Sequence, residues 1–304
     1  MRGQTLQKES PHLGLVCVTS SKAVRFRTTT RTYYLKKSES EREIALRQIY
    51  ADNLQQLHDA LTFCQQHNIQ LYRLPSGLFP LCDLEDGVGA QILIEMSAEL
   101  GCIGQRSQEL GIRSVLHPDQ FVVLSSDSPQ VVDTSIKILE RHAQTFDLLG
   151  LARSPWALMN IHGGKSQRTE QLVQVINQLP EEIKSRLTLE NDEYAYSASE
   201  ILEACDRTGV PMVFDAHHHV CHEHLSSYEE PSVAEMFAAA RSTWLHPEWQ
   251  LVHISNGQSA FADRQHSDFI TDMPSCYRDT PWIEVEAKAK EEAIERLQIE
   301  WLVD

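Results

Sequence analysis

Short apolar runs alternate with longer amphipathic stretches along the whole chain. The apolar runs predict strands over 13–18, 69–75, 112–118, 155–162, 186–192, 211–219, 249–257 and 282–287. The stretches between them have helical periodicity and predict helices over 38–67, 88–110, 128–150, 165–179, 197–209, 232–244 and 288–302. The strands are apolar throughout rather than alternating, which is typical of parallel strands buried on both faces.

The eight predicted strands and the helices that alternate with them occupy almost all of the 304 residues. Because a closed barrel of this kind needs about 250 residues, we predict a single TIM (β/α)8 barrel domain over 13–304, after a disordered segment over 1–12. The structural alternative is an open doubly wound sheet, which would have a glycine-rich phosphate turn after its first strand. The segment VCVTSSKAV contains no glycine, and this favours the barrel.

The composition indicates the cellular compartment in which the protein works. The seven cysteines include no CxxC pair and are odd in number, which disfavours a disulfide framework and indicates a reducing environment. The segment 1–12 is polar and lacks the apolar stretch of a secretory signal. No apolar run approaches the roughly 20 residues that span a bilayer. We therefore expect a cytoplasmic protein that does not contact a membrane.

The net charge of −16 disfavours nonspecific binding to nucleic acid by the surface as a whole, but the charge is unevenly distributed. No acid lies between Glu9 and Glu39, whereas this stretch holds Lys22, Arg25, Arg27, Arg31, Lys36 and Lys37. A local basic stretch of this kind can bind phosphates. The alternative is a solvated loop whose charges carry no function, and the sequence leaves both interpretations open.

Side chains of the types that bind metals stand at the ends of six consecutive predicted strands. They are His117, His162, Glu190, Asp215 (with His218 three residues later), His253 and Glu286. A βα barrel directs the carboxyl ends of all its strands to one mouth, where such enzymes keep their chemistry. Imidazole and carboxylate are natural ligands of Zn²⁺ or Mn²⁺. The set predicts a hydrolytic site with several metals.

Each residue also has a structural interpretation when taken alone. Glu190 ends an apolar strand, where an unpaired carboxylate would be costly to bury, but Asn191 and Asp192 after it are also typical of a solvated turn. The run DAHHH from Asp215 is the strongest single motif, because three consecutive histidines after a buried strand are rare by chance. As one constellation over consecutive strands, these residues favour function.

The last strand and the loop before it offer further candidates. Glu284 and Glu286 are two residues apart and face the same side of a strand, and Glu286 is nearer the mouth. His266 can return to the mouth from the long loop 256–281, and Lys288 near the mouth can add positive charge beside a phosphate. A Ser-His-Asp hydrolase is disfavoured because the chain has no GxSxG motif.

Several of these segments together resemble one enzyme family. HPDQFVVL, NIHGG, LTLEND, VFDAHHH, HSDFI and IEVEAKAKE are similar to the ultraviolet damage endonucleases, barrel enzymes related to endonuclease IV and the xylose-isomerase-like proteins. The resemblance covers roughly 13–295. It implies three divalent ions, Mn²⁺ or Zn²⁺, with Glu190 bridging two of them. One ion would be held with His117 and His162, the second by Asp215, His253 and Glu286, and the third by His218 and His266.

The resemblance also implies a reaction. The family nicks the DNA backbone immediately 5′ of pyrimidine dimers, 6-4 photoproducts and often abasic sites, so damaged double-stranded DNA is the expected partner of what we expect to be a monomer. Gln120 matches the glutamine that probes the duplex where damaged bases leave the stack. Damaged sites unstack cheaply, which gives selectivity through deformation energy.

The sequence departs from the family pattern at three positions. Phe121 stands where the family has a tyrosine, and it keeps the aromatic face needed for a wedge. Leu15 stands where a tyrosine often follows Gly14, and it can wedge but not stack. Leu251 replaces a lysine that often precedes the histidine of the seventh strand by two residues.

Three alternative functions are left open. The first is an endonuclease IV-like enzyme restricted to abasic sites. The second is a sugar isomerase or epimerase on the same barrel, which needs at most two metals and a small closed pocket. The third is a DNA-binding relative without catalytic activity, which would neither hold metal nor nick DNA.

Overall fold

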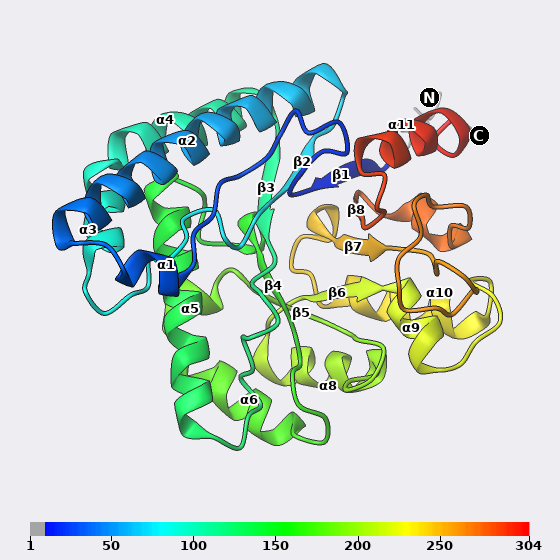
Figure 1. Ribbon diagram of the computed structural model, residues 1–304. Helices are drawn as coiled ribbons and strands as arrows, with labels where there is room; N and C mark the ends of the chain where they lie inside the picture. Colours follow the sequence, from blue (N-terminus) through cyan, green and yellow to red (C-terminus); the bar gives the residue numbers. More distant parts are fainter. Residues whose placement is uncertain (1–9, 304) are drawn as a thin grey trace, which may run out of the picture.

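Eight parallel strands close into one barrel in the computed structural model, which describes residues 10–303 (Figure 1). The strands are β1 (His12–Val16), β2 (Leu71–Leu74), β3 (Arg113–Leu116), β4 (Met159–His162), β5 (Leu187–Glu190), β6 (Met212–Asp215), β7 (Leu251–Ile254) and β8 (Trp282–Val285). Each strand pairs with the next in the sequence, and β8 pairs with β1 to close the barrel. The predicted TIM barrel is confirmed.

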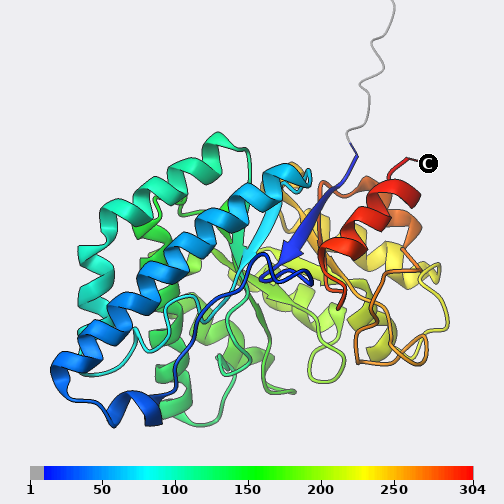
Figure 2. The same ribbon diagram turned by 45° about the horizontal axis from the view of Figure 1, so that its top comes forward.

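Helices surround the barrel on the outside (Figures 1 and 2). They are α1 (Arg31–Leu35), α2 (Glu39–Gln66), α3 (Val88–Glu95), α4 (Ser97–Glu109), α5 (Pro129–Leu148), α6 (Thr169–Gln178), α7 (Glu181–Lys184), α8 (Ala198–Thr208), α9 (Ala216–His222), α10 (Pro231–Ser242) and α11 (Glu291–Glu300), with 3-10 turns η1 (Pro155–Ala157), η2 (Pro247–Trp249) and η3 (Ser275–Asp279). The long helix α2 lies beside α4 along one flank. Among residues 10–303, no helix combines the length and the apolar character that crossing a bilayer requires.

The interior of the barrel is divided into layers because successive side chains of a strand point to opposite faces. Leu251 and His253 of β7 therefore face inward one above the other, as do Trp282 and Glu284 of β8. The lower layer is an apolar cluster of Leu71, Val115, Leu158, Val213, Trp244, Leu251 and Trp282. A separate and larger core packs the outward side chains of the strands against the helices. The inward side chains above this layer, towards the carboxyl ends of the strands, include the polar residues His253 and Glu284.

The sixth predicted strand is too long. The strand ends at Asp215, and the histidines after it begin helix α9 instead of continuing to residue 219. The physical reason is an N-cap: the Asp215 side chain accepts a hydrogen bond from the backbone N–H of His218 at 2.8 Å and so starts the helix. This turn brings His218 back over the end of its own strand.

The predicted helix over 88–110 is interrupted at Met96, between α3 and α4. Gly104 lies inside α4, where an added Cβ would be 1.6 Å from the carbonyl oxygen of Leu149. That glycine therefore serves close packing of α4 against the end of α5. Two other boundaries differ: η1 replaces the start of the fourth predicted strand, and α1 lies in the segment predicted as loop.

The amino-terminal boundary is only partly described. Residues 1–9 of the predicted disordered segment 1–12 lie outside the described residues, and β1 begins at His12. Leu15 is fully buried on the outward face of β1, within the core between barrel and helices. A wedge at Leu15 is therefore wrong, because this strand directs its side chain away from the mouth.

Candidate metal centre at the mouth of the barrel

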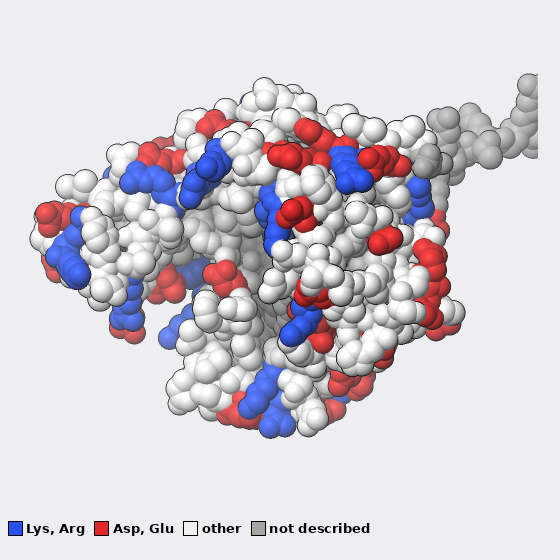
Figure 3. Space-filling model, turned by 45° about the vertical axis from the view of Figure 1, so that its right-hand side comes forward, with Lys and Arg blue, Asp and Glu red and all other residues white. Residues whose placement is uncertain are grey.

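A cavity of about 1040 Å³ opens at the carboxyl ends of the strands. Six of the eight predicted metal ligands line it: His117, His162, Glu190, His218, His266 and Glu286. Asp215 and His253, the other two predicted ligands, are fully buried. Figure 3 shows the surface hollowed between two parts of the molecule, with basic and acidic side chains at the edges of the hollow. The barrel thus gathers residues that are up to 169 positions apart in the sequence, from His117 to Glu286.

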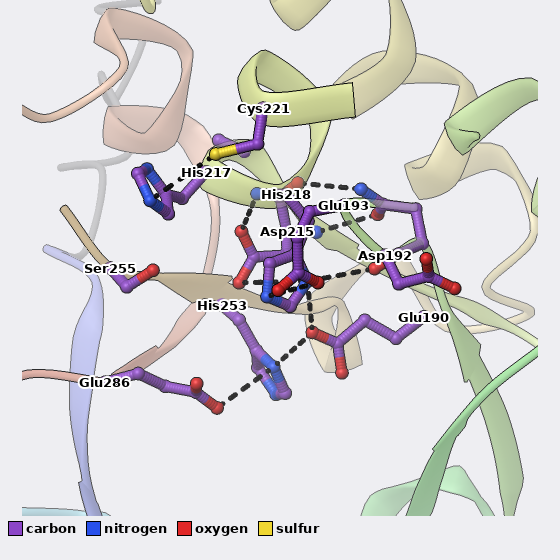
Figure 4. A network of polar contacts seen from close by, with 12 residues as sticks. Glu190, Asp192, Glu193, Asp215, His217, His218, Cys221, His253, Ser255 and Glu286 are labelled. Atoms are coloured by element: carbon purple, nitrogen blue, oxygen red, sulfur yellow. Dashed lines mark hydrogen bonds and ion pairs between the residues drawn. The ribbon is translucent and has the colours of Figure 1, made fainter. Parts of the chain in front are cut away.

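Glu190 lies at the centre of this group, at the end of β5, with an exposed fraction of only 1%. Its Oε2 atom is 3.1 Å from Nε2 of His117 and 3.9 Å from Nε2 of His162. Its Oε1 atom is 3.2 Å from Nδ1 of His218 and 3.0 Å from Nδ1 of His253 (Figure 4). Each carboxylate oxygen therefore faces two imidazoles, which is the arrangement that a bridging ligand needs.

The surrounding imidazoles also control the charge of Glu190. Burial acts to raise the pKa of this carboxyl, but the charges of His253 and His162 outweigh burial and hold the pKa well below its usual value. Asn160 donates to Oε2 from the layer below, and Thr188 in turn donates to the amide oxygen of Asn160 at 2.9 Å. This chain of hydrogen bonds holds the carboxylate in a single orientation.

Asp215 has one oxygen with a partner and one without. Its Oδ1 atom caps α9, whereas Oδ2 is buried with no hydrogen-bond partner among the described residues. This Oδ2 atom is 3.8 Å from Nδ1 of His218 (Figure 4). A buried carboxylate oxygen without a partner is costly, and a bound cation would remove that cost. The residues present therefore fit a metal at this position.

Two groups of donor atoms could each hold an ion, and both include Glu190. His117 and His162 form one group with it, and Asp215 and His218 form the other, with the donor atoms of each group within 4.8 Å of one another. Imidazole nitrogen with carboxylate oxygen is a ligand set suited to Zn²⁺ or Mn²⁺. The candidate metal-binding residues predicted from the sequence are thus brought together in at least two clusters.

His253 and Glu286 have a different environment, which is set by Arg73 of β2. The Arg73 guanidinium bonds Glu284 twice, at 2.9 and 2.8 Å, and its Nη2 is 2.5 Å from Oε1 of Glu286. The same Nη2 is 3.1 Å from Nε2 of His253. Sequence reasoning missed Arg73, although an arginine inside the apolar run LYRL was a signal that could have found it.

The pKa values in this group follow from its alternating charges. Burial alone would lower the pKa of His253, but the carboxylates of Glu190 and Glu284 raise it to about 10. Burial alone would raise the pKa of Glu284, but Arg73 and His253 lower it to about 2. The group thus holds cations and carboxylates that stabilise one another in the barrel interior.

His266 reaches the site from the loop between β7 and β8. An isolated antiparallel bridge between Gly257 and His266 turns the chain back towards the mouth. The Nδ1 atom of His266 is 3.9 Å from Oε2 of Glu286. Lys288 behaves differently: its side chain is exposed, its Nζ donates to Oε1 of Gln258 at 2.7 Å, and it is not among the residues that line the cavity.

The predicted probing residues lie on the loop after β3. Gln120 and Phe121 both line the cavity, and Phe121 has an exposed fraction of 70%. A large exposed aromatic side chain at the edge of a cavity is available to contact a ligand. Leu251, in contrast, is fully buried in the lower apolar layer beneath His253, so it does not reach the cavity surface.

Comparison with known proteins gives a consistent result. The family model described as "UV-endonuclease UvdE" matches residues 11–302. The UV DNA damage endonuclease of Nostoc sp. is 67% identical over 300 residues, which cover 99% of this chain and 93% of that protein. The enzyme of the same name from Deinococcus radiodurans is 49% identical over 290 residues, with 95% of each chain covered.

Solved structures show the same fold. The crystal structure of SacUVDE superimposes with a TM-score of 0.78 at 27% identity and covers 95% of this chain and 98% of its own. Endonuclease IV from Thermus thermophilus superimposes with a TM-score of 0.57 at 12% identity, covering 95% of this chain and 97% of its own. At that identity the second likeness concerns the fold alone.

Proposed function

The chain belongs to the UV-endonuclease UvdE family, and from that membership we propose that it is a metal-dependent endonuclease that hydrolyses the DNA backbone beside ultraviolet lesions. The observation that carries the proposal is Glu190, a buried carboxylate with two imidazoles at each oxygen beneath an open cavity. A site of this kind suits several metals and a large substrate. The distant likeness to endonuclease IV supports only the common barrel.

The proposed site holds three divalent ions, Mn²⁺ or Zn²⁺. Bound ions would supply Lewis acidity that activates water and stabilises negative charge on the phosphate. The ligand sets are those that the resemblance implies. The first ion would be held by Glu190, His117 and His162, and the second by Asp215, His253 and Glu286. The third would be held by His218 and His266. The donor group of His117, His162 and Glu190 supports the first set. In the second donor group His218 lies beside Asp215 and Glu190, whereas the resemblance assigns it to a separate ion with His266.

Protein side chains position the reacting groups in this proposal. Arg73 contacts both His253 and Glu286, so its guanidinium orients two of the proposed ligands at once. Such outer contacts set the orientation and basicity of metal ligands. Lys288 remains a predicted source of positive charge, but its present contact with Gln258 leaves it outside the cavity lining.

Gln120 and Phe121 have the proposed role of testing the duplex. Both lie on the exposed loop after β3, at the cavity. An aromatic side chain can insert between base steps that damage has already weakened, and the damaged bases can then leave the stack at low cost. Selectivity would follow from the deformability of damaged DNA instead of from contacts with particular bases.

Cleavage of defined duplexes tests the proposal directly. The purified full chain is incubated with Mn²⁺ and three end-labelled duplexes that carry a pyrimidine dimer, an abasic site or no damage. We expect a nick immediately 5′ of the dimer, and the same test on a 6-4 photoproduct defines the range of lesions. Removal of divalent ions with EDTA serves as the control, since it should abolish the nick.

The other outcomes separate the alternatives. Cleavage of the abasic duplex alone would indicate an abasic-site endonuclease. No cleavage of any duplex by protein that demonstrably holds metal would contradict the proposal and favour a small sugar substrate. No metal and no cleavage would indicate a binding protein without catalytic activity.

A further inference from the structure

Free positive charge is concentrated in one segment of this acidic protein, residues 22–37, which we name the basic segment. It contains no acid, on a chain whose net charge is −16. Four of its cations are exposed and have no carboxylate within ion-pair distance among residues 10–303: Lys22, Arg25, Arg31 and Lys36. These charges are therefore available to an anionic ligand from outside the chain.

The backbone of the basic segment is held in place at its start. The backbone N–H of Arg25 donates to Oε1 of Gln56 at 3.1 Å, and that of Arg27 donates to Oδ1 of Asn53 at 2.7 Å. The amide of Asn53 returns a bond to the carbonyl of Arg27 at 2.9 Å. The side chains of α2 therefore hold the backbone of Arg25 and Arg27 at defined positions along the helix.

The basic segment runs outward from the cavity along α2. Cys17, just after β1, lines the cavity, and farther along the chain Nη2 of Arg42 donates to the carbonyl of Leu35 at 2.9 Å. Its contacts on α2 thus extend from Gln56 to Arg42, fourteen positions or about 21 Å of helix axis. That length corresponds to roughly six base-pair steps of B-DNA at about 3.4 Å each.

Two of the acids beside the basic segment already have partners. Asp52 pairs with Arg27, and Asp86 accepts a hydrogen bond from the Tyr34 hydroxyl at 2.7 Å. In Figure 3 basic side chains, with acids among them, stand on the left-hand part of the molecule, where Figure 1 places α1 and α3. The chain thus leaves the cavity at Cys17 and continues through the basic segment along α2.

We propose that the basic segment binds the phosphate backbone of the duplex that flanks the lesion. This inference depends on the proposed endonuclease function, since it assumes that the cavity receives damaged DNA. The cavity would then select the damage, while Lys22, Arg25, Arg31 and Lys36 add affinity that does not depend on sequence. The acidic remainder of the surface confines that affinity to the DNA arm beside the basic segment.

The salt dependence of binding tests this proposal without requiring cleavage. Anisotropy of a labelled duplex of about 30 base pairs, longer than the roughly six steps that the segment spans, gives the affinity as salt is raised. The slope of log K against log salt is negative, and the variant Lys22→Gln/Lys36→Gln should make it less negative by about two, because each lost phosphate contact removes about 0.9 from its magnitude. Adding Arg25→Gln and Arg31→Gln should reduce the magnitude by about two more.

A matched variant supplies the control. Lys137→Gln/Lys184→Gln removes the same charge from α5, where Lys137 is exposed, and from α7, where Lys184 is half-buried, and it should leave the slope unchanged. An equal decrease in both double variants, or none in either, would overturn the proposal. Nicking at saturating DNA should be the same in all variants, because none of these side chains lines the cavity.

Failure of this inference and failure of the proposed function give different results. If the wild-type protein nicks no damaged duplex in any salt, the proposed function is wrong, and the anisotropy slopes still decide whether the basic segment binds duplex phosphates. If the wild-type protein nicks damaged DNA but the basic segment makes no specific contribution to the slope, only the further inference is wrong.

Discussion

Two buried arginines lie at opposite ends of the barrel interior, on neighbouring strands. Arg73 of β2 is near the mouth and bonds the carboxylates of Glu284 and Glu286. Arg113 of β3 is at the closed end and, among the described residues, makes no ion pair. Its guanidinium donates to three backbone carbonyls, those of Pro155, Trp156 and Trp249, at 2.8–2.9 Å. An arginine side chain thus has charged partners at the mouth of the barrel and neutral partners at its closed end.

The pKa values follow this difference. Burial lowers the pKa of Arg113 to about 9, because its neutral carbonyl partners compensate the lost water only in part. Burial acts in the same direction on Arg73, but Glu284 and Glu286 outweigh it and hold the pKa of Arg73 well above its usual value. Both arginines remain charged near neutral pH. Of the two, Arg73 is the one that contacts predicted metal ligands, His253 and Glu286.

The aromatic side chains complete the contrast. Trp156, Trp282 and Trp244 surround the Arg113 guanidinium, with ring centroids 4.8, 5.3 and 6.0 Å away. Stacking of this kind stabilises a desolvated guanidinium without any negative charge. The closed end of the barrel therefore contributes packing and stability, whereas the mouth concentrates charge for chemistry, as is general for this fold.

The largest expected effect is loss of nicking on replacing Glu190. Glu190→Gln keeps the shape of the side chain but removes the charge that faces four imidazoles. We expect nicking in Mn²⁺ to fall by more than about 10³-fold, equivalent to about 4 kcal/mol of transition-state stabilisation. Wild-type rates in this variant would contradict a bridging role. The exposed Glu235→Gln on α10 is the matched control and should be fully active.

Arg73 should affect activity less than Glu190, because it acts through its neighbours. Arg73→Met leaves Glu284 and Glu286 without their cation, and we expect a decrease in nicking of about 10- to 100-fold, together with weaker Mn²⁺ binding in titrations. Arg73→Lys retains the charge and should recover part of both. Equal loss in the two variants would show that geometry alone matters, since lysine cannot form the two bonds to Glu284.

Arg113 should show the opposite pattern. Arg113→Met removes three charge-assisted bonds and leaves buried carbonyls without donors, so the free energy of unfolding in urea should fall by about 2–3 kcal/mol. Nicking per folded molecule should stay within about twofold of wild type below the unfolding transition, because Arg113 lies at the closed end of the barrel, away from the cavity. A tenfold loss would require the activation free energy to rise by about 1.4 kcal/mol. A large loss of activity in the folded variant would remove the distinction between the two ends of the barrel.

A smaller effect is expected at the edge of the cavity. Gln120→Ala should reduce the ratio of damaged to undamaged duplex bound by about tenfold, with metal content unchanged, because removing a base from the stack costs a few kcal/mol and the glutamine would offset part of that cost. The ratio is measured by competition between labelled and unlabelled duplexes. An unchanged ratio would count against a probing role for this loop.

The smallest effect is expected at Lys288. Its ammonium is exposed and bonded to Gln258, so Lys288→Ala should change nicking by less than about threefold, as is usual for an exposed side chain with a single polar partner. A larger decrease would mean that this lysine turns into the cavity when DNA binds. Measurement at several Mn²⁺ concentrations separates that role from an effect on metal affinity.

Much of the candidate site was predictable because its residues stand at strand ends. His117, His162 and Glu190 each end or directly follow a short apolar run, and a closed parallel barrel places all such ends at one mouth. Where strand ends were misjudged, as after Asp215, a local hydrogen bond decided the outcome by starting a helix. Element type was therefore easier to predict than element boundaries.

Other features depended on contacts between distant strands. Arg73 and Glu284 are 211 positions apart, and no local pattern indicates that they form a pair. Leu15 was expected to reach the mouth, but the direction of its side chain depends on how β1 pairs with β2 and β8. A shift of one position along a strand moves a side chain from the interior to the helix layer.

The sequence by itself determined the alternation of strands and helices, hence the barrel, and the kinds of side chain that stand at its mouth, because apolar periodicity and strand ends are local properties of the chain. Only the tertiary structure decided which oxygen of Glu190 faces which imidazole, which arginine meets carboxylates and which meets carbonyls, and that the basic segment follows α2. The physical reason is that strand register and barrel closure set the distances between residues far apart in the chain, and charge interactions depend steeply on those distances.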